Sequence, residues 1–272
     1  MSRASTSCRA RDDGRGPTGT PACAAETLDR LLGADDRWTD PAAMTDPSRS
    51  IGQTPEAREL RLLADDLVAL PDAQTPQLVA ASSPDDWDRA LLYARTATGL
   101  LRYHSWMADT SPSRTARLLG VRDSMMAADL LATAERGPAL VHAHNARLQR
   151  AESSMRTGDL PVEWWSAGAI VSAELGEGYA FLATALGAIR HRGVHTPPPD
   201  TIEGLLYALP EDRYVVDVRR LASALADVTP AARVSPWFGH APLDPAHVAS
   251  TDGIVFVRDV GRSRVPPAPS SG

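Results

Sequence analysis

The feature that most constrains the fold is an alternation of short apolar segments with helical patterns, which starts after Gly137. The apolar segments have the length of strands and lie at residues 139–144, 179–186, 214–218 and 252–257. Strands separated by helical patterns pair in parallel, with the helices on the faces of the sheet. Upstream, residues 84–108 and 114–135 are two long helical patterns. The sequence therefore predicts an α/β fold: a mostly parallel sheet with flanking helices, and a long helical pair as a cap or insertion.

The two ends of the chain differ in composition from its middle. Residues 1–22 are polar, rich in Arg, Gly and Ser, and lack a helix or strand period, which predicts a disordered leader. Residues 261–272 are rich in Pro and Ser and predict a disordered tail. With 272 residues, 43% of the chain apolar, the remainder can bury a large core. We expect one domain over 23–260, with a helical part at about 55–136 and a sheet part at about 137–260.

Composition excludes several classes of protein. A net charge of -6 argues against nucleic acid as the main partner, and no apolar run reaches the length of a membrane span. The N-terminus lacks the apolar core of a secretory signal, so we expect a cytoplasmic protein. Cys8 and Cys23 are too few and too near the N-terminus for a disulfide framework or a metal site. All 28 basic residues are Arg, which with the heavy Ala, Pro and Asp usage indicates a GC-rich bacterial gene.

We expect the chemistry of this chain in the stretch PALVHAHNAR, residues 138–147. His142, His144 and Asn145 follow the apolar residues at the carboxyl end of the predicted strand, where a parallel sheet faces a crevice. Alternation along a strand places the two histidines on one side, with Cβ atoms roughly 7 Å apart. That spacing permits shared metal ligation, but two ligands do not make a site, and we expect no metal and no other cofactor.

Two alternatives for this stretch stay open on the residues alone. His142 and His144 could serve a metal-dependent hydrolase together with Asp217 or Asp123. In the other alternative, His144 and Asn145 only satisfy backbone groups at the end of a strand. Dinucleotide, nucleoside triphosphate, zinc-protease and serine-hydrolase motifs do not occur in the sequence.

An ordered series of segments resembles the erythromycin esterase-like family. The segments are RDSMMAADLL at 122–131, LVHAHNARL at 140–148, SAGAIVSAELGEGYAF at 166–181 and STDGIVFVRD at 250–259. The resemblance extends from about residue 24 to residue 259. It implies hydrolysis of carboxylic esters, including the lactone ring of macrolides, by a water molecule that a histidine activates. The family is involved in the response to antibiotics and uses no Ser nucleophile.

The resemblance also assigns residues. His144 and Asn145 match the start of the family's HN-x-H motif, whereas Arg147 stands where the family has its second His. The family's N-terminal segment, with a G-E-x-x-H-G-type strand end that carries a catalytic His and Glu, has no counterpart in residues 1–60. The chain thus corresponds to the C-terminal two thirds of the family. This truncation predicts a hydrolase whose activity is reduced or lost. The alternative is a non-catalytic relative that binds macrolide-like small molecules.

We expect His144 to be catalytic and to be oriented by Asn145, with Arg122 or Arg147 stabilising developing charge. Asp123 beside Arg122 fits either the site or a salt link between helix and sheet. Arg147, Met126 and Trp165 are the residues that we expect to contact the ligand. The expected partner is a small-molecule ester substrate or ligand, and neither a nucleic acid nor a membrane.

Overall fold

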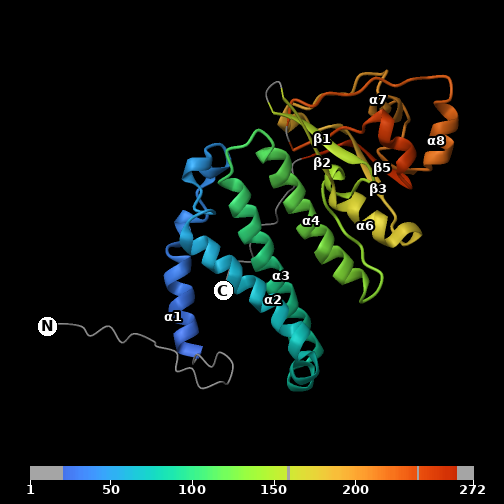
Figure 1. Cartoon of the computed structure of the whole chain (residues 1–272). Coiled ribbons are helices and arrows are strands. Elements are labelled where there is room, and N and C mark those ends of the chain that lie inside the picture. The colour runs from blue at the N-terminus through green and yellow to red at the C-terminus, as the bar shows by residue number, and fades with distance from the viewer. Residues whose placement is uncertain (1–20, 158–159, 238, 262–272) are drawn as a thin grey trace, which may run out of the picture. The chain divides into compact units, whose positions relative to one another are not determined.

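The computed structural model describes residues 21–157, 160–237 and 239–261, and the chain divides into two compact units, Met1–Met125 and Met126–Gly272. Figure 1 shows long helices in the first unit and short strands with short helices in the second. Residues 1–20 and 262–272, which hold most of the predicted leader and tail, lie outside the described residues. None of the helices in the described part is long and apolar enough to cross a membrane.

The first unit is helical. Its helices are α1 (Pro21–Leu32), α2 (Pro55–Ala81), α3 (Pro84–Met107) and the first part of α4 (Arg114–Ala134), with single turns of 3₁₀ helix at Asp35–Arg37, Pro41–Met44 and Pro47–Arg49. Side-chain caps start the long helices: Thr54 accepts a hydrogen bond from the Ala57 N–H, and Ser83 accepts one from the Asp86 N–H. In each case proline takes the first helical position, where its missing N–H costs nothing.

The second unit contains a three-stranded sheet and a separate hairpin. The sheet order is β3 (Leu182–Ala188), β5 (Gly253–Asp259), β4 (Arg213–Val216), and the hairpin consists of β1 (Glu152–Thr157) and β2 (Leu160–Trp165). β3 pairs with β5 in parallel, but β4 pairs with β5 antiparallel, as β1 does with β2. The α/β class is confirmed, whereas the described strands do not form the mostly parallel sheet that the sequence predicted.

The prediction of a strand at residues 139–144 is wrong. These residues form no strand, and 99% of the surface of Leu140 is exposed. An apolar run of this length predicts burial only if another strand or helix covers it. In the second unit the chain instead attaches to the sheet just after this run, through Asn145.

The core of the second unit lies where the short helices pack on the central strands (Figure 1). Ile254 and Phe256 of β5 and Ala183 of β3 have no exposed surface. The short helices of this unit are α5 (Asn145–Leu148), α6 (Ala167–Leu175), α7 (Ile202–Tyr207) and α8 (Val218–Ala224), and a 3₁₀ segment covers Pro245–Ser250. Side chains from α5, α7 and α8 complete the cluster around Phe256.

Gly168 sets the distance between α6 and α5. A Cβ atom at this position would lie 2.1 Å from the carbonyl oxygen of Leu148, so the two backbones touch. We expect Gly168→Ala to lower the free energy of unfolding by about 1–3 kcal/mol, because the backbone must move to admit the methyl group. Urea denaturation measures this effect.

Gly120 provides the matched control for Gly168. It lies within α4, and nothing is within 4 Å of a Cβ added there. Gly120→Ala should raise the free energy of unfolding by up to about 1 kcal/mol, since alanine favours the helix. Equal stabilities of Gly168→Ala and the unmodified chain would contradict the close contact.

Candidate functional site

His144 caps the N-terminus of α5 with its side chain. The imidazole Nδ1 accepts a hydrogen bond of 3.3 Å from the Ala146 N–H. A neutral imidazole whose Nδ1 accepts carries its proton on Nε2, so the outer edge of this ring is a donor. Desolvation by the surrounding protein lowers the pKa of His144, which keeps the ring neutral at pH 7.

Asn145 binds the backbone of β3. Its Nδ2 donates to the Thr184 carbonyl at 2.8 Å, and its Oδ1 accepts from the Thr184 N–H at 3.0 Å. The amide therefore pairs with the strand as another strand would, and it holds α5 against the edge of β3. Asn145 and the His144 Nδ1 thus both satisfy backbone groups, as the packing alternative expected, while the Nε2 edge of His144 takes no part in these bonds.

A second histidine, His240, lies near His144. It is 6% exposed, and its Nδ1 lies 3.1 Å from the hydroxyl oxygen of Ser235. Burial, the positive charge of Arg233 and the proximity of His144 together lower the pKa of His240 to about 4. His240 is therefore also neutral at pH 7. The sequence did not indicate this residue, because it lies in an irregular loop and belongs to no motif.

The loop that carries His240 is anchored at both ends. At one end Arg233 donates to three backbone carbonyls, those of Leu186, Gly187 and His195, at 2.7–3.0 Å. At the other end the Leu243 N–H donates to Glu203 Oε1 at 2.7 Å. These anchors tie the loop to the end of β3 and to α7.

Glu203 is the most buried acid of this region, with 1% of its surface exposed. Burial raises the pKa of its carboxyl group, against the opposing effects of the backbone hydrogen bonds and Arg233. Its Oε2 has no hydrogen-bond partner in the described part of the chain. The carboxyl group therefore has an unused acceptor beside the arginine that anchors the loop.

A cavity of about 200 Å³ lies beside the two histidine segments. Asn145 and Ala241, which directly follow His144 and His240 in the chain, are both part of its wall. Its other polar side chains are those of Gln149, Ser154, Asp244, His247 and Thr251, and its apolar ones include Phe181, Leu243 and Val248. The wall is thus of mixed polarity, with side chains that can donate and accept hydrogen bonds.

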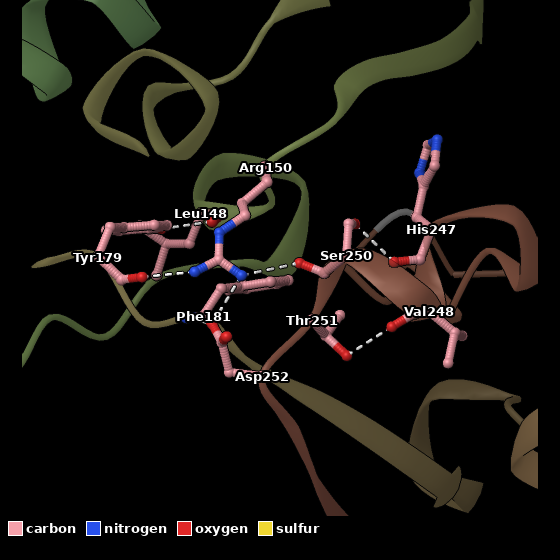
Figure 2. Close-up of polar contacts among 9 residues, drawn as sticks. All are labelled: Leu148, Arg150, Tyr179, Phe181, His247, Val248, Ser250, Thr251 and Asp252. Atoms are coloured by element: carbon pink, nitrogen blue, oxygen red, sulfur yellow. Dashed lines mark hydrogen bonds and ion pairs between the residues drawn. The ribbon is translucent and has the colours of Figure 1, made fainter. Parts of the chain in front are cut away.

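A clasp around Arg150 holds part of this wall in place (Figure 2). Arg150 donates to the carbonyls of Tyr179 and Ser250 and pairs with Asp252 at 2.8 Å. Asp252 also accepts from the Phe181 N–H at 2.7 Å, and the Tyr179 hydroxyl donates to the Leu148 carbonyl. Burial raises the pKa of Tyr179 to about 12, so the hydroxyl keeps its proton. The clasp therefore joins the end of α5 to the starts of β3 and β5.

The other predicted site residues of the second unit are Arg147, Met126 and Trp165. In the second unit, the Arg147 guanidinium lies 5.6 Å from the ring centroid of Trp164, and Trp165 is 61% exposed. Met126 packs on the apolar cluster of α4 and α6 around Ala127. None of Arg147, Met126 and Trp165 is among the described residues that line the cavity.

Arg122 and Asp123 belong to the first unit, on α4. Asp123 is fully buried, and the Nε atom of Arg122 is buried without a hydrogen-bond partner among the described residues. Whether Arg122 and Asp123 form a salt link between helix and sheet or act in the site is not tested by these contacts, and both roles stay predictions.

The metal alternative requires at least three ligands from the protein. Among the described residues, no group of three or more His, Cys, Asp or Glu side chains could hold a metal ion. Asp217, one of the two acids considered as a third ligand, accepts hydrogen bonds from the N–H groups of Arg219 and Arg220 as the cap of α8.

Comparison with known proteins gives one match. The model of the family described as erythromycin esterase matches residues 20–260, nearly the range of the resemblance noted in the sequence. No curated protein and no solved structure matches the chain.

The two hydrogen bonds between the Asn145 amide and the Thr184 backbone, here called the Asn145 clamp, predict a variant whose stability depends on pH. In Asn145→Asp at pH 7, one carboxylate oxygen still accepts from the Thr184 N–H, but the other faces the Thr184 carbonyl and repels it. We expect a loss of about 1–3 kcal/mol in the free energy of unfolding. A protonated carboxyl can donate to that carbonyl, so the pKa in the folded state is raised. The loss therefore shrinks below the unfolded pKa and grows as the pH rises through the folded pKa.

Chemical denaturation at pH 4 and pH 7 measures this effect. Asn145→Ala is the control, because it loses both hydrogen bonds and adds no titratable group. A destabilisation by Asn145→Asp that is the same at both pH values would contradict the clamp.

The Arg150 clasp predicts that part of the folding stability is lost in acid. The pKa of Asp252 lies below its ordinary value, since the Phe181 N–H and Arg150 outweigh the opposing effect of burial. Its contribution to stability is complete above the unfolded pKa and is lost as the pH falls through the folded pKa. We expect Asp252→Asn to cost about 1 kcal/mol at pH 7, a value reduced by solvent screening, and to cost almost nothing near pH 3.

Thermal unfolding between pH 3 and pH 7 tests this expectation. Asp212→Asn is the control, because its carboxylate is 87% exposed and lies 3.5 Å from Arg258. If the difference in stability between Asp252→Asn and the unmodified chain stays constant with pH, the charge of the Asp252 carboxylate contributes nothing to stability.

Proposed function

Because the chain belongs to the erythromycin esterase family, we propose that it hydrolyses carboxylic esters at the site around His144. The observation that carries this proposal is the neutral imidazole of His144, which has its proton on Nε2 and directly precedes Asn145, a residue in the wall of a cavity of mixed polarity. Hydrolysis adds water across the ester and releases an acid and an alcohol.

The hydrogen bond from Ala146 favours one role for His144. The resemblance implied a base that deprotonates water, but a base needs a free lone pair, and the only lone pair of this ring points to the Ala146 N–H. As a donor, the Nε2–H binds the carbonyl oxygen of the ester and stabilises the negative charge that develops on it. A neutral histidine suits this role because it polarises a carbonyl without giving up its proton.

The size of the cavity bears on the class of substrate. Its volume of about 200 Å³ is below the roughly 300–1,000 Å³ of pockets that enclose drug-sized ligands. It therefore fits the acyl or the alkoxy arm of an ester rather than a whole macrolide ring. A macrolide lactone as substrate would place its ester bond at His144 and most of its ring outside the cavity.

Ligand binding without turnover is the second candidate. The described residues that line the cavity include no arginine, and Arg147, one of the two expected charge stabilisers, faces the ring of Trp164. Without an arginine among these lining residues, an oxyanion receives less stabilisation than the resemblance implied.

Hydrolysis assays on the purified chain decide between the two candidates. The substrates are a series of p-nitrophenyl esters of increasing acyl length and a 14-membered macrolide, whose opened ring gains the mass of one water. His144→Asn is the informative variant, since asparagine also caps helices and preserves the bond from Ala146. We expect it to lower kcat by about 10²–10³-fold, because it removes the Nε2–H donor.

His191→Asn is the control, a change of the same kind at an exposed histidine outside the site. Turnover that is unaffected in both variants would contradict the role of His144. Calorimetric binding of an ester with no hydrolysis would favour the second candidate.

A further inference from the structure

We propose that His240 is the base that activates the attacking water, with its Nδ1 proton held by Ser235 and its Nε2 lone pair available. This inference rests on the proposed ester hydrolysis. It adds a catalytic residue that neither the sequence motifs nor the family match assigns.

The contacts of Ser235 determine which nitrogen of His240 carries the proton. The Ser235 hydroxyl oxygen lies 3.0 Å from the Trp237 carbonyl and accepts from the Trp237 N–H at 3.2 Å. A carbonyl can only accept, so the single hydroxyl proton goes to Trp237. The contact between His240 and Ser235 is then a hydrogen bond only if the His240 Nδ1 donates. All three contacts are satisfied together when the His240 proton is on Nδ1, which leaves a lone pair on Nε2.

The two histidines are therefore complementary. His144 has a proton on Nε2, and His240 has a lone pair on Nε2. They are close enough for the charge of one to affect the other, and the segments that carry them line the same cavity. A carbonyl polarised by the first and a water deprotonated by the second are the two requirements of general-base ester hydrolysis.

The proposed reaction balances without any other reactant. The His240 Nε2 takes a proton from water while the water oxygen bonds to the carbonyl carbon, and the carbonyl electrons move to the oxygen that faces His144. The tetrahedral intermediate collapses, the bond to the alkoxy oxygen breaks, and the proton on His240 passes to that oxygen. The products are a carboxylic acid and an alcohol.

The charged groups near His240 set its strength as a base. Arg233 and a protonated His144 both disfavour a positive charge on His240. The carboxyl group of the buried Glu203 interacts electrostatically with Arg233. With a pKa of about 4, His240 is a weak base that stays unprotonated across the neutral range. Hydrolysis should therefore favour esters with easily displaced alcohols, such as aryl esters, over alkyl esters.

Nitrogen NMR on the unmodified chain tests the proton position directly. Two-bond proton–nitrogen spectra of the ¹⁵N-histidine-labelled chain distinguish a ring with a proton on Nδ1 from one with a proton on Nε2. We expect Nδ1–H at His240 and Nε2–H at His144 at pH 7. An Nε2–H signal at His240 would overturn the proposal, whatever the activity of the chain.

Kinetics of His240→Asn test the catalytic role. The asparagine amide can still donate to Ser235 but cannot act as a base, so we expect kcat for p-nitrophenyl esters to fall by about 10²–10⁴-fold. The fall in kcat/KM of the unmodified chain at low pH should have an apparent pKa of about 4, and the residual activity of the variant should lack it. His191→Asn is again the control. A folded His240→Asn chain with unchanged kcat would overturn the proposal.

Ser235→Ala separates positioning from catalysis. Without the hydroxyl, the Nδ1 proton loses its acceptor, so we expect the Nε2–H form of His240 to appear in the NMR spectra and kcat to fall less than in His240→Asn. A chain that hydrolyses no ester would overturn the proposed function and the role of His240 with it. An active chain with its His240 proton on Nε2 would overturn only the role of His240.

Discussion

The two hydrogen bonds between the Asn145 amide and the Thr184 backbone hold the histidine segment to the sheet. They are needed because residues 139–144 make no strand, and because a helix of four residues has too few internal hydrogen bonds to be stable alone. The far end of α5 is fixed as well: the Tyr179 hydroxyl donates to the Leu148 carbonyl, and Gly168 lets α6 touch that same carbonyl. The position of His144 therefore depends on contacts that reach α5 from β3, from α6 and from Tyr179 in the segment before β3.

Arginine provides most of the long-range connections around the site. Arg233 and Arg150 each bond to carbonyls of segments that are far apart in the sequence, and Arg150 also pairs with a carboxylate. A guanidinium has five N–H donors in a fixed plane, so one side chain can bond several carbonyls at once. Lysine, which the sequence lacks, has a smaller and more strongly hydrated head group that could not make the same set of bonds.

The sequence predicted local features better than pairing. The helices that begin after Ser83 and Ser166 were predictable, because each cap is written in a few neighbouring residues. The prediction of a strand at 139–144 was wrong, and the described strands do not form the mostly parallel sheet that was predicted. Both predictions failed because burial and pairing depend on segments elsewhere in the chain. His144 was predicted as a site residue through its motif. His240 was not, because its environment arises from Ser235, Arg233 and Glu203, which have no fixed spacing.

The contacts that select the two tautomers also resist protonation. A proton added to His144 would occupy Nδ1 and break the bond from the Ala146 N–H, and a proton added to His240 would place a second positive charge near Arg233. Burial lowers the pKa of both rings further. In the proposed reaction, one neutral ring donates and the other accepts, so neither has to gain or lose a proton before the ester arrives. The proposed division of roles therefore follows from the loop and cap geometry and does not require a catalytic carboxylate.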